Sequence, residues 1–207
     1  GHIGTTSFFP SRNLGCYGDG GAMFTNNNKI AKKLRMIANH GQETKYYHKV
    51  IGCNSRLDSI QASILNVKLN YFDNYSKLRN QMAEIYDKSF IEIAELTIPK
   101  RKNNSNHVFH QYTLKVKKDL RGSLINFLKE NNIPAMIYYP VPLYKQEAFQ
   151  HFVSEDFSIP NVEELCKTVL SLPIHTEIEN SSQEFIIKKI KEFFNKKNFY
   201  EKRIFRT

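Results

Sequence analysis

The sequence predicts an α/β fold built from two parts that a long helix connects. Two short strand-like segments, residues 3–9 and 20–25, flank a glycine-rich turn near the amino end. An apolar stripe with helical spacing then runs through residues 58–90, a length that often bridges two domains. After it, shorter strands alternate with helices, which is the pattern of a small α/β layer sandwich.

The segment between the second strand and the long stripe predicts one further helix. Residues 27–39 place apolar side chains on one side, asparagine is available as the N-cap, and Gly41 can close the carboxyl end. Tyrosine and histidine follow at residues 46–48, where we expect a hydrated loop.

The later elements are shorter. We expect, in chain order, a strand at 108–116, a helix at 120–131, a strand at 135–139, and helices at 162–169 and 182–196. Much of the net charge of +10 lies in the tail of the chain, where basic residues alternate with Ile190 and Phe193 at helical spacing. This pattern favours the solvated face of an amphipathic helix over a nucleic-acid interface.

Composition narrows the class of protein. The 207 residues are 41% hydrophobic and 24% charged, as in an ordinary globular protein, and no apolar run approaches membrane-spanning length. The cysteines Cys16, Cys53 and Cys166 form no Cys-x-x-Cys pair, so we expect no metal site and three buried or half-buried thiols. These features predict a cytoplasmic protein without a membrane or nucleic-acid partner.

Six stretches of the sequence contain candidate functional motifs, and they are spread over most of the chain. In order they read SFFPSRNLGCYGDGGAMFTN, HG, GCNSRLDSIQASIL, HQYT, YYPVPLYKQ and SLPIH. Together they resemble the DegT/DnrJ/StrS-type sugar aminotransferases, which are pyridoxal-phosphate enzymes that aminate keto-sugars attached to nucleotides. Each stretch alone is weak evidence, whereas six in the family's order are not expected by chance.

This resemblance implies an aspartate-aminotransferase-like fold (PLP fold type I) and covers the later part of a family chain. Residues 1–57 would be the end of the large cofactor-binding domain, residues 58–92 the connecting helix, and residues 93–207 the small carboxyl-terminal α/β domain. The resemblance also implies a homodimer with shared active sites, pyridoxal 5'-phosphate as cofactor, and glutamate as the amino donor. The aminated sugar would enter polysaccharide or glycan biosynthesis.

Arg12 stands where the resemblance places the family's Schiff-base lysine, five residues after Ser7. A Schiff base needs an amine that can lose its proton, and a guanidinium stays protonated and is poorly nucleophilic. We therefore expect that pyridoxal phosphate is not covalently bound to this chain. Arg12 could instead hold a phosphate or an aldehyde oxygen by charge-assisted hydrogen bonds. Without the surrounding motif, Arg12 would be interpreted as a surface cation in a turn.

The resemblance assigns cofactor-binding roles to three further residues. Ser7 would donate its hydroxyl to the phosphate, Gly20 would let the backbone approach the cofactor, and Asn54 would reach the phosphate of the partner subunit. Local alternatives stay open, because a strand-end serine can bond its own backbone, a glycine can serve a turn, and an asparagine can cap a helix. Tyr139 and Tyr144 are candidates for the substrate pocket, and aromatic residues of a strand can equally belong to the core.

Two alternatives stand beside amino transfer. Some relatives that lack the lysine are sugar dehydratases that use pyridoxamine phosphate, although arginine is a poor general base for that reaction. A truncated or degenerate homologue would keep the fold without the chemistry. The sequence thus predicts the family and leaves the activity of this chain open.

Overall fold

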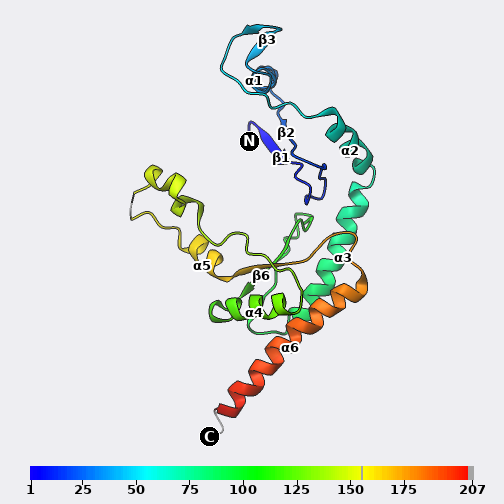
Figure 1. Ribbon diagram of the computed structural model, residues 1–207, viewed down its shortest axis with the longest axis vertical. Helices are drawn as coiled ribbons and strands as arrows, with labels where there is room; N and C mark the ends of the chain where they lie inside the picture. The colour runs from blue at the N-terminus through cyan, green and yellow to red at the C-terminus, as the bar shows by residue number, and fades with distance from the viewer. Residues whose placement is uncertain (155, 205–207) are drawn as a thin grey trace. The chain divides into compact units, whose positions relative to one another are not determined.

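The computed structural model describes residues 1–154 and 156–204, with side chains through residue 196 apart from residue 155. Internal contacts divide the chain into two compact units, Gly1–Tyr75 and Ser76–Thr207. In Figure 1 the first unit runs from blue at the N-terminus to blue-green near residue 75. The division falls inside the segment 58–92 that was expected to connect two domains, and the domain limits proposed from the sequence stay a prediction.

The first unit begins with an antiparallel pair of strands. Strand β1 (Gly4–Ser7) pairs with β2 (Gly21–Phe24), and Ser7 lies opposite Gly21 at one end of the ladder. Both strands were predicted, and each is shorter than its apolar pattern.

Helix α1 (Asn28–Ala38) follows and confirms the predicted helix and both of its caps. The Asn27 side chain accepts hydrogen bonds from the backbone N–H groups of Lys29 and Ile30, at 2.9 and 3.2 Å. At the other end, the Gly41 N–H donates to the carbonyl of Met36 at 2.8 Å, and Gly41 has a φ of +75°.

The hydrated loop expected at residues 46–48 is wrong, because these residues belong to a hairpin. Strand β3 (Gln42–Thr44) pairs with β4 (Tyr47–His48), and Tyr46, with a φ of +71°, lies at the turn between them. The Nδ1 atom of His48 also lies 2.8 Å from the carbonyl oxygen of His40. The sequence suggested a loop because these residues are polar or aromatic. The strands that they form are mostly exposed.

The single long helix expected over residues 58–90 is also wrong. Helix α2 (Ser59–Leu69), capped by Asp58, ends before α3 (Phe72–Phe90) begins. The N–H groups of Asn70 and Tyr71 bond three residues back, to Val67 and Lys68, so the helix tightens and stops. The apolar spacing continues across this break, which explains why the pattern looked continuous.

The second unit contains a three-stranded antiparallel sheet in the order β5 (Leu96–Thr97), β6 (Tyr112–Val116), β7 (Val169–Leu172). Its helices are α4 (Lys118–Glu130), α5 (Pro160–Thr168) and α6 (Asn180–Ile204), with 3₁₀ helices η1 (Leu143–Lys145) and η2 (Glu147–Phe152). The predicted helices and β6 are confirmed. The strand expected at 135–139 is wrong, since only an isolated bridge joins Met136 to Ser171.

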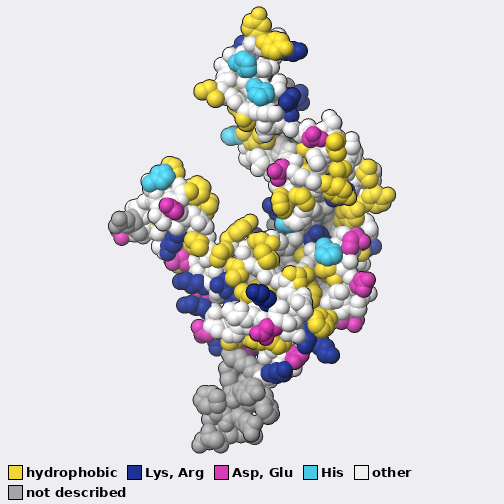
Figure 2. Space-filling view, viewed as in Figure 1, with side chains coloured by type: hydrophobic (Ala, Val, Ile, Leu, Met, Phe, Trp, Pro, Cys, Tyr) yellow, Lys and Arg dark blue, Asp and Glu magenta, His cyan; other side chains and the backbone are white. Residues whose placement is uncertain are grey.

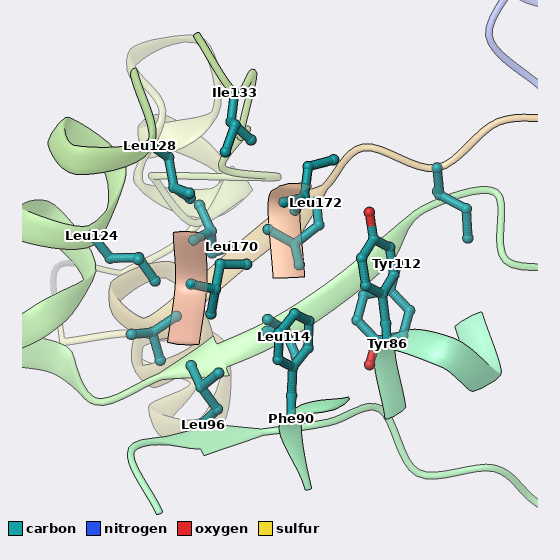
Figure 3. Close-up of a cluster of buried hydrophobic side chains, with 14 of the residues drawn as sticks. Tyr86, Phe90, Leu96, Tyr112, Leu114, Leu124, Leu128, Ile133, Leu170 and Leu172 are labelled. Carbon is teal, nitrogen blue, oxygen red and sulfur yellow. The ribbon is translucent and has the colours of Figure 1, made fainter. Parts of the chain in front are cut away.

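The core of the second unit forms between its sheet and its helices, as Figure 3 shows. Apolar side chains of β6 and β7 pack with those of α3 and α4, and Tyr86, Phe90, Tyr112 and Leu114 are fully buried. The hydroxyls of the two buried tyrosines are satisfied, because Tyr86 donates to the Pro173 carbonyl at 2.9 Å and Tyr112 to a carboxylate oxygen of Asp87 at 2.8 Å.

A buried arginine ties two of the sequence motifs together in this unit. One terminal nitrogen of Arg79 donates to the carbonyls of Phe109 and His110 at 3.2 Å and to that of Ile174 at 2.9 Å. The HQYT and SLPIH stretches are therefore held at one point of α3. The carbonyl of His110 thus takes part in the framework, just before β6 begins at Tyr112.

The first unit has little core of its own. Its buried apolar side chains are those of Cys16 and Leu65, whereas Ile60, Val67 and Leu69 of α2 are 57–69% exposed. In Figure 2, hydrophobic side chains gather over α2 at the upper right. Within the described part of the chain, none of the helices is sufficiently long and apolar to span a bilayer.

Candidate functional site

The loop between β1 and β2 presents Arg12 at the tip of a tight turn. The strand pairing continues past Ser7 through bonds from the Phe8 N–H to the Gly20 carbonyl and from the Cys16 N–H to the Phe8 carbonyl, both 2.8 Å. The Arg12 N–H then closes the turn on the Phe9 carbonyl at 2.9 Å.

Gly15 is required for this turn to close. A Cβ atom there would lie 2.5 Å from the carbonyl oxygen of Pro10 and 2.7 Å from that of Phe9, which no side chain permits. The sequence reasoning did not single out Gly15, because a glycine in a loop gives no sign of which atoms approach it.

Gly20 lies against the inside of the first unit. A Cβ there would meet the sulfur of Cys16 at 3.0 Å, a methyl of Leu57 at 3.1 Å and the Cβ of Phe8 at 3.3 Å. Its lack of a side chain therefore serves packing, a role that the sequence did not predict. The thiol of Cys16 is fully buried and donates to the carbonyls of Phe8 and Gly18 at 3.0 and 2.9 Å.

The Arg12 side chain is exposed, and its guanidinium forms no hydrogen bond or ion pair with the described residues. All of its donors are thus accessible to an anion from solution. The loop of residues 7–21 contains no lysine. The loop therefore carries a cation at residue 12 and no amine of its own.

Ser7 ends β1 beside this turn. Its hydroxyl oxygen accepts a hydrogen bond from the Phe9 N–H at 3.2 Å, which is the local backbone bond that the sequence left open. Because the oxygen is the acceptor there, the hydroxyl proton remains able to donate to a phosphate.

Asn54 is fixed by the end of α1 and not by a helix cap. It forms a bridge with Asn39, and the N–H of the next residue, Ser55, donates to the Ala38 carbonyl at 2.9 Å. Asp58 caps α2 instead, by accepting from the Ile60 N–H at 2.7 Å.

Arg56 accompanies Asn54 on the surface. Its Nε donates to the Asn54 side-chain oxygen at 3.0 Å, which leaves the Asn54 amide N–H groups and the outer guanidinium nitrogens as donors. Both side chains are exposed, so this pair could bind an anion brought by another molecule.

Tyr139 and Tyr144 belong to the second unit and differ in accessibility. Tyr139 is 69% exposed. The hydroxyl of Tyr144 donates to a carboxylate oxygen of Glu163 at 2.7 Å and accepts from the Ile159 N–H at 3.0 Å. Tyr144 therefore joins the two ends of the segment between η1 and α5, residues 146–159, which we call the excursion.

Glu163 was missed by the sequence reasoning and organises this excursion. Lys145 at 2.9 Å, the Tyr144 hydroxyl and the Ser158 hydroxyl at 3.0 Å all donate to one of its oxygens. These donors lower the pKa of Glu163 to about 2, with Lys145 as the largest cause. No pattern within α5 distinguishes it from Glu164, because its partners come from outside the helix.

The three cysteines differ from one another. Cys16 is buried and Cys166 half-buried, as expected, but the prediction is wrong for Cys53, which is exposed. The backbone of Cys53 is engaged on both sides, with its N–H on the Ile37 carbonyl and its carbonyl on the His40 N–H, each at 2.9 Å. This pairing directs the backbone inward and leaves the thiol outside.

Two known sequences and one solved structure show what this chain is similar to. The chain is 42% identical over 196 residues to a pleiotropic regulatory protein of Geobacillus stearothermophilus, covering 94% of this chain and 52% of that protein. It is 41% identical over 184 residues to the UDP-2-acetamido-2-deoxy-3-oxo-D-glucuronate aminotransferase of Pseudomonas aeruginosa, covering 89% and 50%. A solved DegT DnrJ EryC1 StrS aminotransferase from Brucella abortus matches with a TM-score of 0.86 at 37% identity, over 94% of this chain and 51% of that one.

The chain therefore spans about half the length of the relatives it matches. The solved relative confirms the predicted α/β fold class, with the fold of these aminotransferases. The DegT/DnrJ/EryC1/StrS aminotransferase family description matches residues 1–191, which is nearly the whole chain. From its motifs, its fold and this match, the chain belongs to the DegT/DnrJ/EryC1/StrS aminotransferase family.

Proposed function

We propose that this chain is the carboxyl-terminal part of a pyridoxal-phosphate-dependent aminotransferase acting on a nucleotide-linked keto-sugar, with arginine at the position of the cofactor lysine. The observation that carries the proposal is the turn that presents residue 12 beside Ser7, within a family motif. The Pseudomonas relative is named as an aminotransferase of a UDP-linked oxo-sugar, which supports this substrate class.

The residues of the loop fit the phosphate of the cofactor but not its covalent attachment. The Ser7 hydroxyl and the Arg12 guanidinium are donors suited to a phosphate. When bound, pyridoxal phosphate supplies an electron sink for the transfer of an amino group. In this chain Arg12 would bind an anion. Because a guanidinium stays protonated at neutral pH, Arg12 could neither bond covalently to the aldehyde nor act as a base.

Asn54 and Arg56 support a homodimer as part of the proposal. Their free donors would complete the phosphate site of a second copy, so that one protomer alone would hold the cofactor weakly. Glutamate as the amino donor, and polysaccharide or glycan biosynthesis as the destination of the sugar, complete the proposal through the family resemblance.

A non-catalytic role is the second candidate, and Arg12 is the observation that favours it. The Geobacillus relative is named a pleiotropic regulatory protein rather than an aminotransferase. Under this candidate the chain would keep the fold and the anion site and would not turn over a sugar.

Borohydride reduction in the presence of pyridoxal phosphate tests the proposal. We expect no adduct at residue 12 in the natural chain, and a stable adduct there after Arg12→Lys in a protein that also contains the amino-terminal half of the aminotransferase fold, mapped by peptide mass spectrometry. Arg12→Gln is the matched control, since it removes the cation without adding an amine. Failure of Arg12→Lys to react above the level of exposed surface lysines would contradict the assignment of residue 12.

A further inference from the structure

The loop that presents Arg12 lies along helix α2, and it is contacted at three levels by Leu57, just before the helix, and by two residues of α2. Near the start of α2, a Leu57 methyl lies 3.1 Å from the position of a Cβ on Gly20. One turn further, the Gln61 side chain lies 3.3 Å from the corresponding position on Gly18. Two turns beyond Gln61, Lys68 reaches Gly15. The loop therefore packs along the helix, and the two segments are antiparallel.

Two of these contacts are polar side chains that bind the loop backbone. The side-chain oxygen of Gln61 accepts from the Tyr17 N–H at 2.8 Å. The ammonium of Lys68 donates to the Gly15 carbonyl at 2.7 Å. The spacing of seven residues is close to two helical turns, so one face of α2 provides both.

Lys68 is held by this loop rather than by an acid. It is half-buried, its ammonium lies 4.7 Å from the centre of the Tyr17 ring, and it forms no ion pair with the described residues. The Lys68 ammonium interacts with an aromatic ring and with a backbone carbonyl at the same time. These two interactions restrain the position of the loop segment that Lys68 contacts.

The anchored residues are those that determine where residue 12 lies. Gly15 closes the turn on the carbonyls of Phe9 and Pro10, so a displacement of Gly15 displaces the turn and its tip. Because the first unit buries few apolar side chains, packing alone gives this loop little support.

We propose that Gln61 and Lys68 are positioning residues, which hold the loop from α2 and so set the location of residue 12 and of the cofactor phosphate. This inference rests on the proposed function for its cofactor part. The placement of the loop itself can be measured without any cofactor. The same helix starts just after Asn54 and Arg56, so it also links this loop to the donors proposed for the second copy.

Cys16 reports on the loop in the natural chain, because it lies between the two anchored residues. Its thiol is fully buried, while that of Cys53 is exposed. We expect Lys68→Met and Gln61→Leu each to raise the rate of Cys16 alkylation by iodoacetamide about tenfold, as loss of one such hydrogen bond implies. Cys53 should react at an unchanged rate, and Lys68→Arg should restore most of the protection.

Two controls separate this role from general stability. Lys33→Met removes an exposed lysine of α1 and should leave Cys16 protected. Cys166 belongs to the second unit and should keep its natural rate in every variant. If Cys16 is as well protected in Lys68→Met and Gln61→Leu as in the natural chain, the proposal is overturned. A general rise that includes Cys166 would also overturn it, because α2 would then stabilise the chain as a whole.

The cofactor part is tested in the Arg12→Lys background. Lys68→Met and Gln61→Leu should lower the yield of the reduced pyridoxal-phosphate adduct at residue 12 about tenfold, and Lys68→Arg should recover it. An unchanged yield in a chain whose Cys16 has become reactive would overturn the positioning role. If Arg12→Lys forms no adduct with α2 intact, the proposed function fails, and Cys16 labelling still decides whether α2 positions the loop.

Discussion

Residue 12 lies at the tip of a turn whose backbone bonds do not depend on the side chain that it carries. The Arg12 N–H bonds to the Phe9 carbonyl, and Gly15 allows the turn to close. A lysine at residue 12 would be compatible with the same backbone bonds. What differs is protonation, because an amine can be neutral near physiological pH in a suitable environment and a guanidinium cannot. The turn can thus keep its shape with either side chain at residue 12.

Gly41 gives a prediction at the same scale. Its φ of +75° disfavours any side chain, and a Cβ there would lie only 1.7 Å from the Val50 carbonyl oxygen. We expect Gly41→Ala to destabilise the first unit by more than about 2 kcal/mol and to loosen the segment that carries Asn54. Urea unfolding followed by circular dichroism measures the change.

Gly122 is the matched control for this substitution. It lies in α4 with nothing within 4 Å of the position that a Cβ would take, and alanine is the better helix former. Gly122→Ala should leave stability unchanged or raise it by up to about 1 kcal/mol. Equal effects of the two substitutions would refute the account of the Gly41 turn.

At the scale of elements, the sequence predicted the helices and strands that local residues specify. It missed those that depend on contacts between residues far apart in the sequence. Helix α1 was found with both caps because Asn27 and Gly41 are local signals. Strand β7 was missed because it follows α5 with no intervening loop and its four residues are all buried. Its pairing with β6 is a contact between segments far apart in the sequence.

The excursion between η1 and α5 gives a pH-dependent prediction. The folded pKa of Glu163 is lowered to about 2 from 4.5, so its stabilising effect is fully present above the unfolded pKa and is lost as pH falls through the folded one. Protection of the Ile159 amide against hydrogen exchange should therefore hold from pH 7 to 4.5 and fall between 4.5 and 2, after correction for the intrinsic rate.

Glu163→Gln is the variant that isolates this carboxylate. It keeps an acceptor for Tyr144 but removes the charge that binds Lys145. The Ile159 amide should then be less protected at pH 7, without the transition below pH 4.5. A transition that persists in Glu163→Gln would show that another group holds the excursion.

For the whole molecule, the two units differ in what covers their apolar side chains. The second unit buries a core among its own elements, whereas strands β1 and β2 are accessible on both faces. The motifs predicted the family and fold because they span both units. They could not predict the roles of Gln61 and Lys68, which depend on α2 lying against a loop more than forty residues earlier in the chain.

A crystal structure of the Arg12→Lys chain, joined to the amino-terminal half of the aminotransferase fold and soaked with pyridoxal phosphate, tests the central claim most directly. The account predicts electron density that joins the cofactor aldehyde carbon to the side-chain nitrogen of residue 12, with the phosphate beside Ser7. Crystals of the natural chain should hold the cofactor without any such link. Continuous density from the aldehyde to a different side chain, in either crystal, would contradict the claim.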